Sequence, residues 1–363
     1  MERVIVNSLG DYMEYIAHFA EADCVGKRME IKENLPILWF RGQSNANYSL
    51  IPSLYRRKNV QILKDTYTKY TRAHYAEDIR TQHYIAKNFH LLSKEPSSRV
   101  EWLEVMQHHQ MYTRVLDWSE SSLHSLLFAL EPFFDNGKYR EADRRKSLPC
   151  VWVLSPKKMN KNNLESLEKD KELQKCLLSD LEAKFYEKQK ILDNIRKYSD
   201  FEYYAQTEDT CHIDYIFNLS SINDEVLRDR ERLKELLMQG EVINPYYYLL
   251  SRVYSDGYVL PERNLAPLCV VHPYHSERIR AQRGVFTVFP FYRDQPGDSL
   301  FRELGINPDA MEQNDSARKC LRQILINDPQ KVAMEMMGNG MYDSWLYPEM
   351  PVVSSEIENH MIY

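Results

Sequence analysis

The chain has 363 residues, of which 28% are charged and 43% belong to the hydrophobic set, a composition typical of a globular protein with a sizeable core. Its 47 basic and 53 acidic residues leave a net charge of -6, which excludes a general electrostatic grip on nucleic acid or on an anionic membrane but allows a local basic patch. Only 11 residues are glycine, and neither a G-x-G-x-x-G nor a G-x-x-x-x-G-K-[ST] phosphate loop is present.

Cysteine usage and the N-terminus bear on the compartment. The six cysteines are scattered without a C-x-x-C pair, so we expect reduced, mostly buried thiols and no structural metal site. The first 24 residues are too charged and too interrupted for a signal peptide or a membrane span. We therefore expect a cytoplasmic protein with no membrane contact.

Short apolar runs alternate with helical patterns along the first part of the chain. A helix is expected after the cap at Asn7-Ser8. Further strands are expected at residues 4–6, 37–40 and 115–118, and further helices at 61–92, 101–110 and 123–134.

The second part of the chain contains three apolar runs of strand length. They are residues 150–154 (CVWVL), 268–272 (LCVVH) and 285–289 (VFTVF), and the first is expected to be a central strand. Residues 156–204 are rich in lysine and glutamate, which indicates a solvated helical insertion, with a partner-binding helix as the alternative. Residues 316–336 have helical periodicity.

These patterns predict an α+β fold with a mixed, mainly antiparallel sheet flanked by helices and carrying a charged helical insertion. We expect five segments: an N-terminal helical lead-in (1–35), the first part of the core (36–155), the insertion (156–244), the second part of the core (245–292) and a C-terminal helical tail (293–363).

The first candidate site lies where the apolar run at 37–40 ends in Arg41-Gly42-Gln43. A guanidinium offers a planar fork of donors that suits phosphate or carboxylate, and a glycine lets backbone or ligand come close. Arg41 and Gln43 are therefore candidate ligand-binding residues. An internal ion pair of Arg41 is the alternative.

The second candidate site is QHHQMYTRVLDWSES, residues 107–121. His108 and His109 are adjacent, so on a helix they point about 100° apart and do not share one metal ion. Each is a candidate acid or base, with a structural hydrogen bond as the alternative.

Four residues at the following strand, Arg114, Asp117, Trp118 and Ser119, extend this second site, and Arg114 is a further candidate ligand-binding residue. Asp117 is expected to orient Arg41 or Arg114, or to bind a ribose hydroxyl. Trp118 either stacks on a base or fills the core. Ser119 lacks the G-x-S-x-G surroundings of a nucleophile.

The third candidate site is RIRAQRG, residues 278–284, with three arginines within six residues. It is either a solvated basic turn or an anion site beside the sheet, to which Gln282 contributes neutral hydrogen bonds.

Three blocks together resemble the FRG domain, a bacterial module named after its Phe-Arg-Gly motif, here Phe40-Arg41-Gly42. The blocks are WFRGQS with SLIPSLYR, then MQHHQMYTRVLDWSESSLHSLLFAL, then RIRAQRGVFTV, and they span about residues 36–290 in the family's order. The tail at Leu346-Tyr347-Pro348 is similar to the family's ending. This chain has Gln110-Met111-Tyr112 where the family pattern has Gly-Leu-Pro, and residues 156–240 look like an insertion. The resemblance implies a fold more than a reaction.

A looser resemblance to ADP-ribosyltransferases implies NAD as the ligand and a protein or nucleic acid as acceptor. By position, Arg41 would hold an NAD phosphate, Ser119 would support the nicotinamide side, and Gln282 would stand where those enzymes have a carboxylate. An amide cannot stabilise a developing cation with negative charge, so Glu120 or Glu277 would have to take that part, or transfer is absent. Two other functions stay open: a metal-independent RNA-processing enzyme that uses His108 or His109, and a non-catalytic interaction module.

Overall fold

The computed structural model of the protein describes residues 1–23, 38–56, 72–88, 90, 96, 99–135, 138–139, 147–173, 253–254, 259–260, 262–271, 276–293, 295–298 and 307–360. The expected helix at 61–92 is described only in part, as α3 (Arg72–Asn88). Most of the expected insertion at 156–244, together with Cys24, Cys176 and Cys211, lies outside the described residues.

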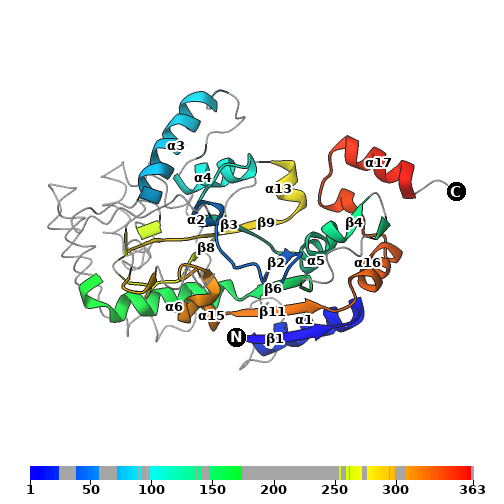
Figure 1. The fold of residues 1–363 in the computed structure, drawn as a ribbon, viewed down its shortest axis with the longest axis horizontal. Helices are drawn as coiled ribbons and strands as arrows, with labels where there is room; N and C mark the ends of the chain where they lie inside the picture. The colour runs from blue at the N-terminus through cyan, green and yellow to red at the C-terminus, as the bar shows by residue number, and fades with distance from the viewer. Residues whose placement is uncertain are drawn as a thin grey trace, which may run out of the picture.

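A seven-stranded sheet forms the centre of the molecule, in the order β1-β11-β6-β2-β3-β9-β8 (Figure 1). Its strands are β1 (Glu2–Val6), β2 (Trp39–Gln43), β3 (Val115–Ser119), β6 (Cys150–Leu154), β8 (Leu268–Val270), β9 (Gly284–Val288) and β11 (Leu321–Ile326). β1 and β11 are parallel, and the other neighbours pair antiparallel. The predicted α+β fold with a mixed, mainly antiparallel sheet is confirmed. Two small two-stranded ladders join β7 (Val259–Leu260) to β10 (Phe291–Tyr292) and β4 (Phe134–Asp135) to β5 (Lys138–Tyr139).

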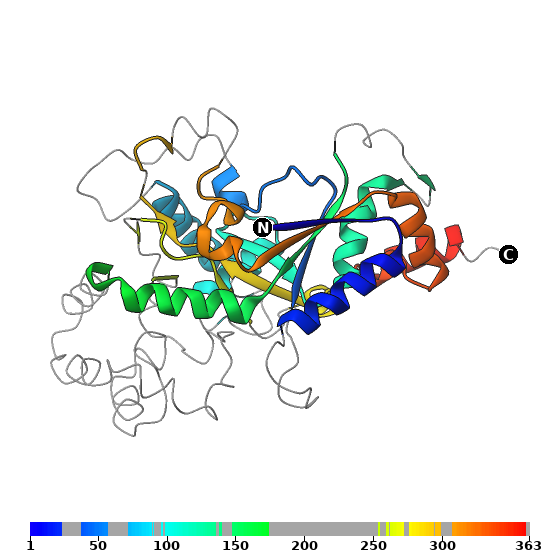
Figure 2. The same ribbon diagram turned by 90° about the horizontal axis from the view of Figure 1, so that it is seen from below.

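Helices flank the sheet, with α6 at one end of the molecule and α16 and α17 at the other (Figure 2). They are α1 (Leu9–Asp23), α2 (Ser53–Arg56), α3, α4 (Arg99–His108), α5 (Ser122–Leu130), α6 (Pro156–Lys169), α13 (Glu277–Ala281), α15 (Asp315–Arg318), α16 (Pro329–Gly338) and α17 (Met350–His360). Three-residue 3-10 turns occur at Glu131–Phe133, Met311–Gln313 and Asp343–Trp345. None of the described helices has the length and apolar character needed to cross a membrane.

The sheet separates two apolar cores. One contains side chains of α1, α5 and α16 together with Phe40, and the other contains side chains of α6 and α15 together with Trp39. Neighbouring strand residues point to opposite faces, which is why Trp39 and Phe40 belong to different cores. All five residues of β6 are buried, as expected for a central strand covered on both faces.

Helix α6 corrects the expectation that the lysine-rich segment is solvated from its first residue. Met159, Leu164 and Leu167 on this helix are buried. The Asn160 side chain also exchanges two hydrogen bonds of 2.9 Å with the backbone of Cys269 in β8. The first part of the segment therefore covers the edge of the sheet, where unpaired backbone groups need partners.

The helix expected at residues 316–336 is wrong in its middle part. Residues 321–326 form β11, which lies between β1 and β6, and helix α16 starts only at Pro329. The C-terminal part of the chain thus supplies an inner strand of the sheet.

Candidate functional site

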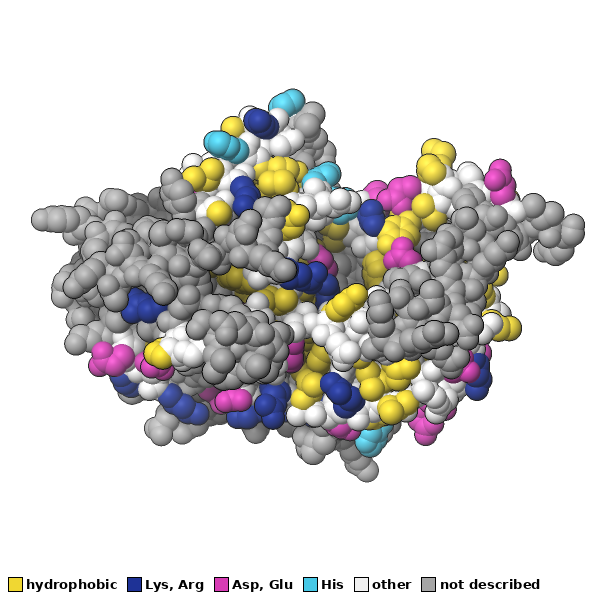
Figure 3. Space-filling view, viewed as in Figure 1, with side chains coloured by type: hydrophobic (Ala, Val, Ile, Leu, Met, Phe, Trp, Pro, Cys, Tyr) yellow, Lys and Arg dark blue, Asp and Glu magenta, His cyan; other side chains and the backbone are white. Residues whose placement is uncertain are grey.

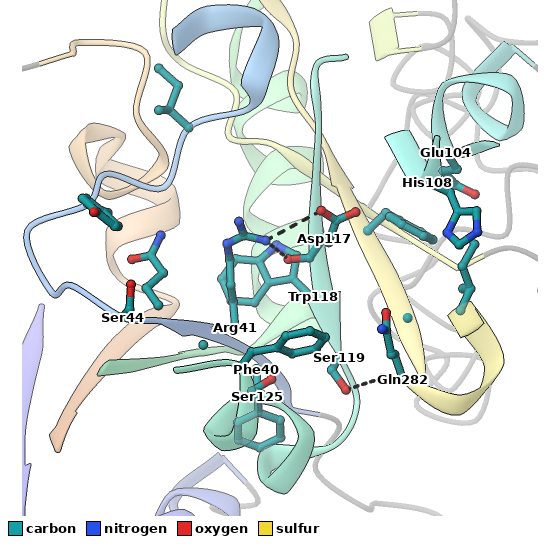
Figure 4. Close-up of a pocket in the computed structure, with 18 of the residues that line it drawn as sticks. Phe40, Arg41, Ser44, Glu104, His108, Asp117, Trp118, Ser119, Ser125 and Gln282 are labelled. Carbon is teal, nitrogen blue, oxygen red and sulfur yellow. Dashed lines mark hydrogen bonds and ion pairs between the residues drawn. The ribbon is translucent and has the colours of Figure 1, made fainter. Parts of the chain in front are cut away.

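The site begins where β2 and β3 separate. These strands pair at Phe40 and Ser119, whereas β2 pairs along its whole length with β6, and β3 pairs along its whole length with β9. The side of the sheet between Arg41 and Asp117 is therefore open, and their side chains lie in the opening (Figure 4).

Arg41 spans this opening. Its Nη1 donates a hydrogen bond to the backbone oxygen of Asp117 at 2.5 Å and lies 3.9 Å from Asp117 Oδ2. Its Nε is buried and has no hydrogen-bond partner among the described residues. Burial lowers the pKa of the guanidinium to about 10, although Asp117 acts in the opposite direction, so Arg41 is charged at neutral pH. A largely buried, incompletely paired cation favours an anion beside it.

The residues of the Phe-Arg-Gly motif point to alternate faces of the sheet, as successive residues of a strand do. Phe40 packs into the core beneath α5, Arg41 points to the opposite face, and Gly42 again faces α5. A Cβ on Gly42 would lie 1.9 Å from the Ser125 backbone oxygen and 2.7 Å from the Ala129 nitrogen. Glycine is therefore required for α5 to lie directly on β2 and close one side of the site.

A hydrogen-bond relay fixes the Asp117 carboxylate. Thr113 Oγ1 donates to Gln107 Oε1 at 2.7 Å, and Gln107 Nε2 donates to Asp117 Oδ2 at 3.0 Å. The Asp117 side chain is 47% exposed, so a ligand can reach it.

These groups border a pocket of about 740 Å³, in the size range of small-molecule sites. Its walls come from β2, β3, α4, α5, α13, β9 and the loop at 44–51. Figure 3 shows the hollow at the centre of this face, with basic and acidic side chains at its edge. Arg41, Asp117 and Gln282, which lie far apart in the sequence, all line it.

Ser119 and Gln282 line the pocket and are held by hydrogen bonds. Ser119 Oγ donates to the Gln282 backbone oxygen at 2.7 Å and accepts from the Ser121 nitrogen at 3.0 Å. The Gln282 amide donates to the Leu346 backbone oxygen at 2.9 Å. Both side chains thus connect segments that form the wall.

Gln43 and Trp118 also line the pocket but are almost fully buried. Gln43 Oε1 accepts from Trp152 Nε1 at 2.8 Å, and Trp118 Nε1 donates to Thr287 Oγ1 at 3.0 Å. Trp118 belongs to the apolar core, so its ring supports the pocket floor.

The structure places Arg114 and His109 outside the pocket, which corrects the expectation for both. Arg114 is fully buried, and its guanidinium contacts Glu77 at 2.8 Å and the Phe289 backbone oxygen at 2.9 Å. Its donors are used within the fold, so it cannot orient a ligand. His109 is exposed and stacks at a tilt on Tyr84.

Helix α4 contributes His108 and Glu104, which face the pocket together because residues four apart share one helix face. Both lie across the pocket from Arg41 in the view of Figure 4. Burial lowers the pKa of His108, and His109 and Arg278 act in the same direction, so the imidazole is neutral at pH 7. No cluster of three metal-binding side chains occurs in the described part of the chain.

Sequence reasoning missed Glu104, Tyr48 and Arg56, all of which line the pocket. The i, i+4 spacing of Glu104 and His108 was the available signal for the first. Glu120 and Glu277, the candidates from the sequence for the carboxylate of a transfer reaction, are exposed and lie outside the pocket lining.

The fold and the pocket define an α+β protein with a ligand-sized cleft between two diverging strands, built on a Phe-Arg-Gly strand end. In the comparison with family models, residues 36–137 match the FRG domain, so the protein contains an FRG domain. The matched residues supply β2, β3, α4 and α5, whereas α13 and β9 of the same pocket lie beyond them. No curated protein and no solved structure matches the chain.

Proposed function

We propose that the pocket binds a nucleotide of the NAD class, with Arg41 at a phosphate group. The observation that carries the proposal is a group of three arginines, Arg41, Arg56 and Arg278, which lines one pocket together with the two carboxylates of Glu104 and Asp117. Of these three arginines, only Arg41 has the carboxylate of a described residue within 4 Å, that of Asp117, and its Nε has no hydrogen-bond partner among the described residues. Guanidinium groups bind phosphate in a fixed planar geometry, so they suit a nucleotide phosphate better than a neutral ligand.

The remaining parts of such a ligand also have candidate partners. Asp117 is presented by the Gln107 relay and suits a ribose hydroxyl, which donates to a carboxylate. Tyr48 lines the pocket with 57% of its surface exposed, and we assign the base to its ring in place of the buried Trp118.

We extend the proposal to cleavage of the bond between ribose and nicotinamide, as in an ADP-ribosyltransferase. The glycosidic C–N bond breaks, nicotinamide leaves with the electron pair, and a cation develops on the ribose. Glu104 is our candidate for stabilising that cation, because Gln282 is neutral and Glu104 is the glutamate in the pocket lining. Neutral His108 then accepts the proton of the attacking water or acceptor hydroxyl.

Calorimetric titration with NAD tests the binding step. We expect binding to the wild type and a loss of about 1.5–3 kcal/mol in Arg41→Ala, which is roughly a ten- to hundredfold weaker affinity. Arg322→Ala is the matched control, because this arginine also lies on a strand but pairs with Glu2, outside the pocket. Absence of heat with the folded wild type would remove the proposal.

Nicotinamide release, followed by chromatography, tests the reaction separately. Glu104→Gln should keep NAD binding and lose release, since the shape is retained and the charge is removed. Nicotinamide release at the wild-type rate by this variant would exclude Glu104 as the group that stabilises the cation.

The RNA-processing hypothesis now depends on His108 alone, because His109 lies outside the pocket. This hypothesis predicts that the wild type cleaves labelled RNA in the presence of a chelator and that His108→Gln does not. If Arg41→Ala melts far below the wild type and the wild type binds no nucleotide, the interaction module is the better hypothesis.

A further inference from the structure

The segment Trp345-Leu346-Tyr347 packs against the outside of the pocket wall that α5 and α13 form. Leu346 is fully buried, and its backbone oxygen accepts the hydrogen bond from Gln282. Trp345 meets the ring of His124 edge-on at 6.1 Å, and Tyr347 meets Phe128 edge-on at 6.4 Å. Phe128 and Gln282 line the pocket, so this C-terminal segment holds two of its walls in place.

Tyr347 also holds Arg278. The guanidinium carbon lies over the tyrosine ring, 4.4 Å from its centre, which is a cation–π contact. The tyrosine hydroxyl donates to the carboxylate of Glu131, with distances of 3.2 and 3.3 Å to its two oxygens. The ring is thereby fixed between α5 and α13, and the planar guanidinium is fixed on the ring.

Arg278 lines the pocket without a carboxylate partner among the described residues. Its charge reaches into the site, because it is one of the groups that disfavour protonation of His108. Arg280, two residues along the same helix, differs in each respect: it is exposed, forms an ion pair with Glu277, and lies outside the pocket lining. Of these two arginines, Arg278 lines the pocket and Arg280 does not.

We infer that Arg278, held by Tyr347, is a second anion-binding group, and that the ligand carries two linked phosphates, one at Arg41 and one at Arg278. A guanidinium held over an aromatic ring has a fixed position, and its planar fork of N–H donors suits the bidentate contact that a phosphate makes. The inference rests on the proposed function in taking the pocket as a phosphate site, but it does not require nicotinamide. It assigns Tyr347, outside the residues that match the FRG domain, as a positioning residue.

Titrations with AMP, ADP and NAD test this inference on the full chain. In the wild type, ADP should bind at least tenfold more tightly than AMP, because its second phosphate reaches a second arginine. In Arg278→Ala this ADP-to-AMP ratio should fall to about one, while Arg280→Ala keeps the wild-type ratio. Tyr347→Phe retains the ring and should keep most of the ratio, whereas Tyr347→Ala should lose most of it. Thermal melting of each variant confirms that it is folded.

The outcomes separate the inference from the proposed function. NAD binding with an unchanged ADP-to-AMP ratio in Arg278→Ala overturns the inference and leaves the proposed function standing. Binding of ADP with the expected ratios but no binding of NAD supports the inference and removes the proposed function. Failure of every diphosphate to bind overturns both.

Discussion

At the scale of single residues, Gln110 is the position where this chain lacks the glycine of the FRG pattern. It follows α4 with φ of 61°, in the left-handed region that favours glycine, and the FRG pattern has glycine at this position. A left-handed residue therefore stands in the turn before Thr113 although it is not glycine. A side chain with a Cβ is strained there by about 1 kcal/mol or more.

Gln110→Gly should stabilise the protein by about 0.5–1 kcal/mol, because the relief of strain exceeds the added entropy of the unfolded chain. Urea unfolding followed by circular dichroism measures this change. Gln110→Ala is the control, since it removes the same side chain but keeps the Cβ, and we expect no stabilisation from it. Equal stabilities of the two variants would mean that the backbone at this turn is not strained.

His108 should make nucleotide binding depend on pH. The groups that act on its pKa are His109 and Arg278, which lower it together with burial, and Asp117 and Glu349, which raise it. On acidification the imidazole gains a proton and adds a positive charge to the pocket, so an anion binds more tightly at lower pH.

Between pH 7.5 and pH 5.5 we expect NAD affinity to rise about three- to tenfold in the wild type and to stay nearly constant in His108→Gln. Calorimetry at several pH values checks this. Lowered histidine pKa values also mean that the folded state binds protons more weakly than the unfolded chain, so stability is lost as the pH falls below about 6.5. The titrations therefore need a melting curve at each pH. Weaker binding at low pH by a protein that remains folded would contradict the prediction.

The residue types of the site were only partly predictable. Arg41, Asp117 and Gln282 were predicted because each lies in or beside an apolar run of strand length, and the structure brings them to one pocket. Arg114 has the same local pattern, but its buried partner Glu77 is 37 residues away in the chain. The sequence around Arg114 therefore does not predict this ion pair. Glu104 was missed because a glutamate inside a helix ordinarily faces water.

At the scale of elements, apolar runs identified strands well where all their residues are buried. CVWVL is β6, and VFTVF overlaps β9 with its ends shifted by one residue. β11 was mistaken for helix because Leu321, Ile324 and Leu325 recur at i, i+3 and i+4, the spacing of one helix face. The cap Asp328 followed by Pro329 marks the true start of α16, so a break was readable there. The order of the strands in the sheet could not be predicted, since no residue of β2 indicates that β6 rather than β3 is its full-length partner.

At the scale of the whole molecule, one sheet draws its strands from residue 2 to residue 326. The stretch that matches the FRG domain, residues 36–137, supplies only β2 and β3 of that sheet, and these two pair at a single position. Their full-length partners, β6 and β9, lie beyond the match. The division of the chain into five segments stays a prediction, but the sheet that carries the pocket joins the first segment to the last.

We therefore expect a fragment of residues 36–137 to fail to fold by itself, whereas the full chain folds. In the fragment, β2 and β3 would each lose a complete ladder of backbone hydrogen bonds, and Trp39, Leu116 and Trp118 would lose core partners from β6 and β9. Near-ultraviolet circular dichroism and a urea titration check this, with the full chain prepared in the same way as the control. A cooperative unfolding transition of the fragment would contradict the prediction and make the FRG match an independent domain. A fragment that is unfolded alone but recovers near-ultraviolet structure when mixed with residues 138–363 would show directly that the pocket is assembled from both parts of the chain.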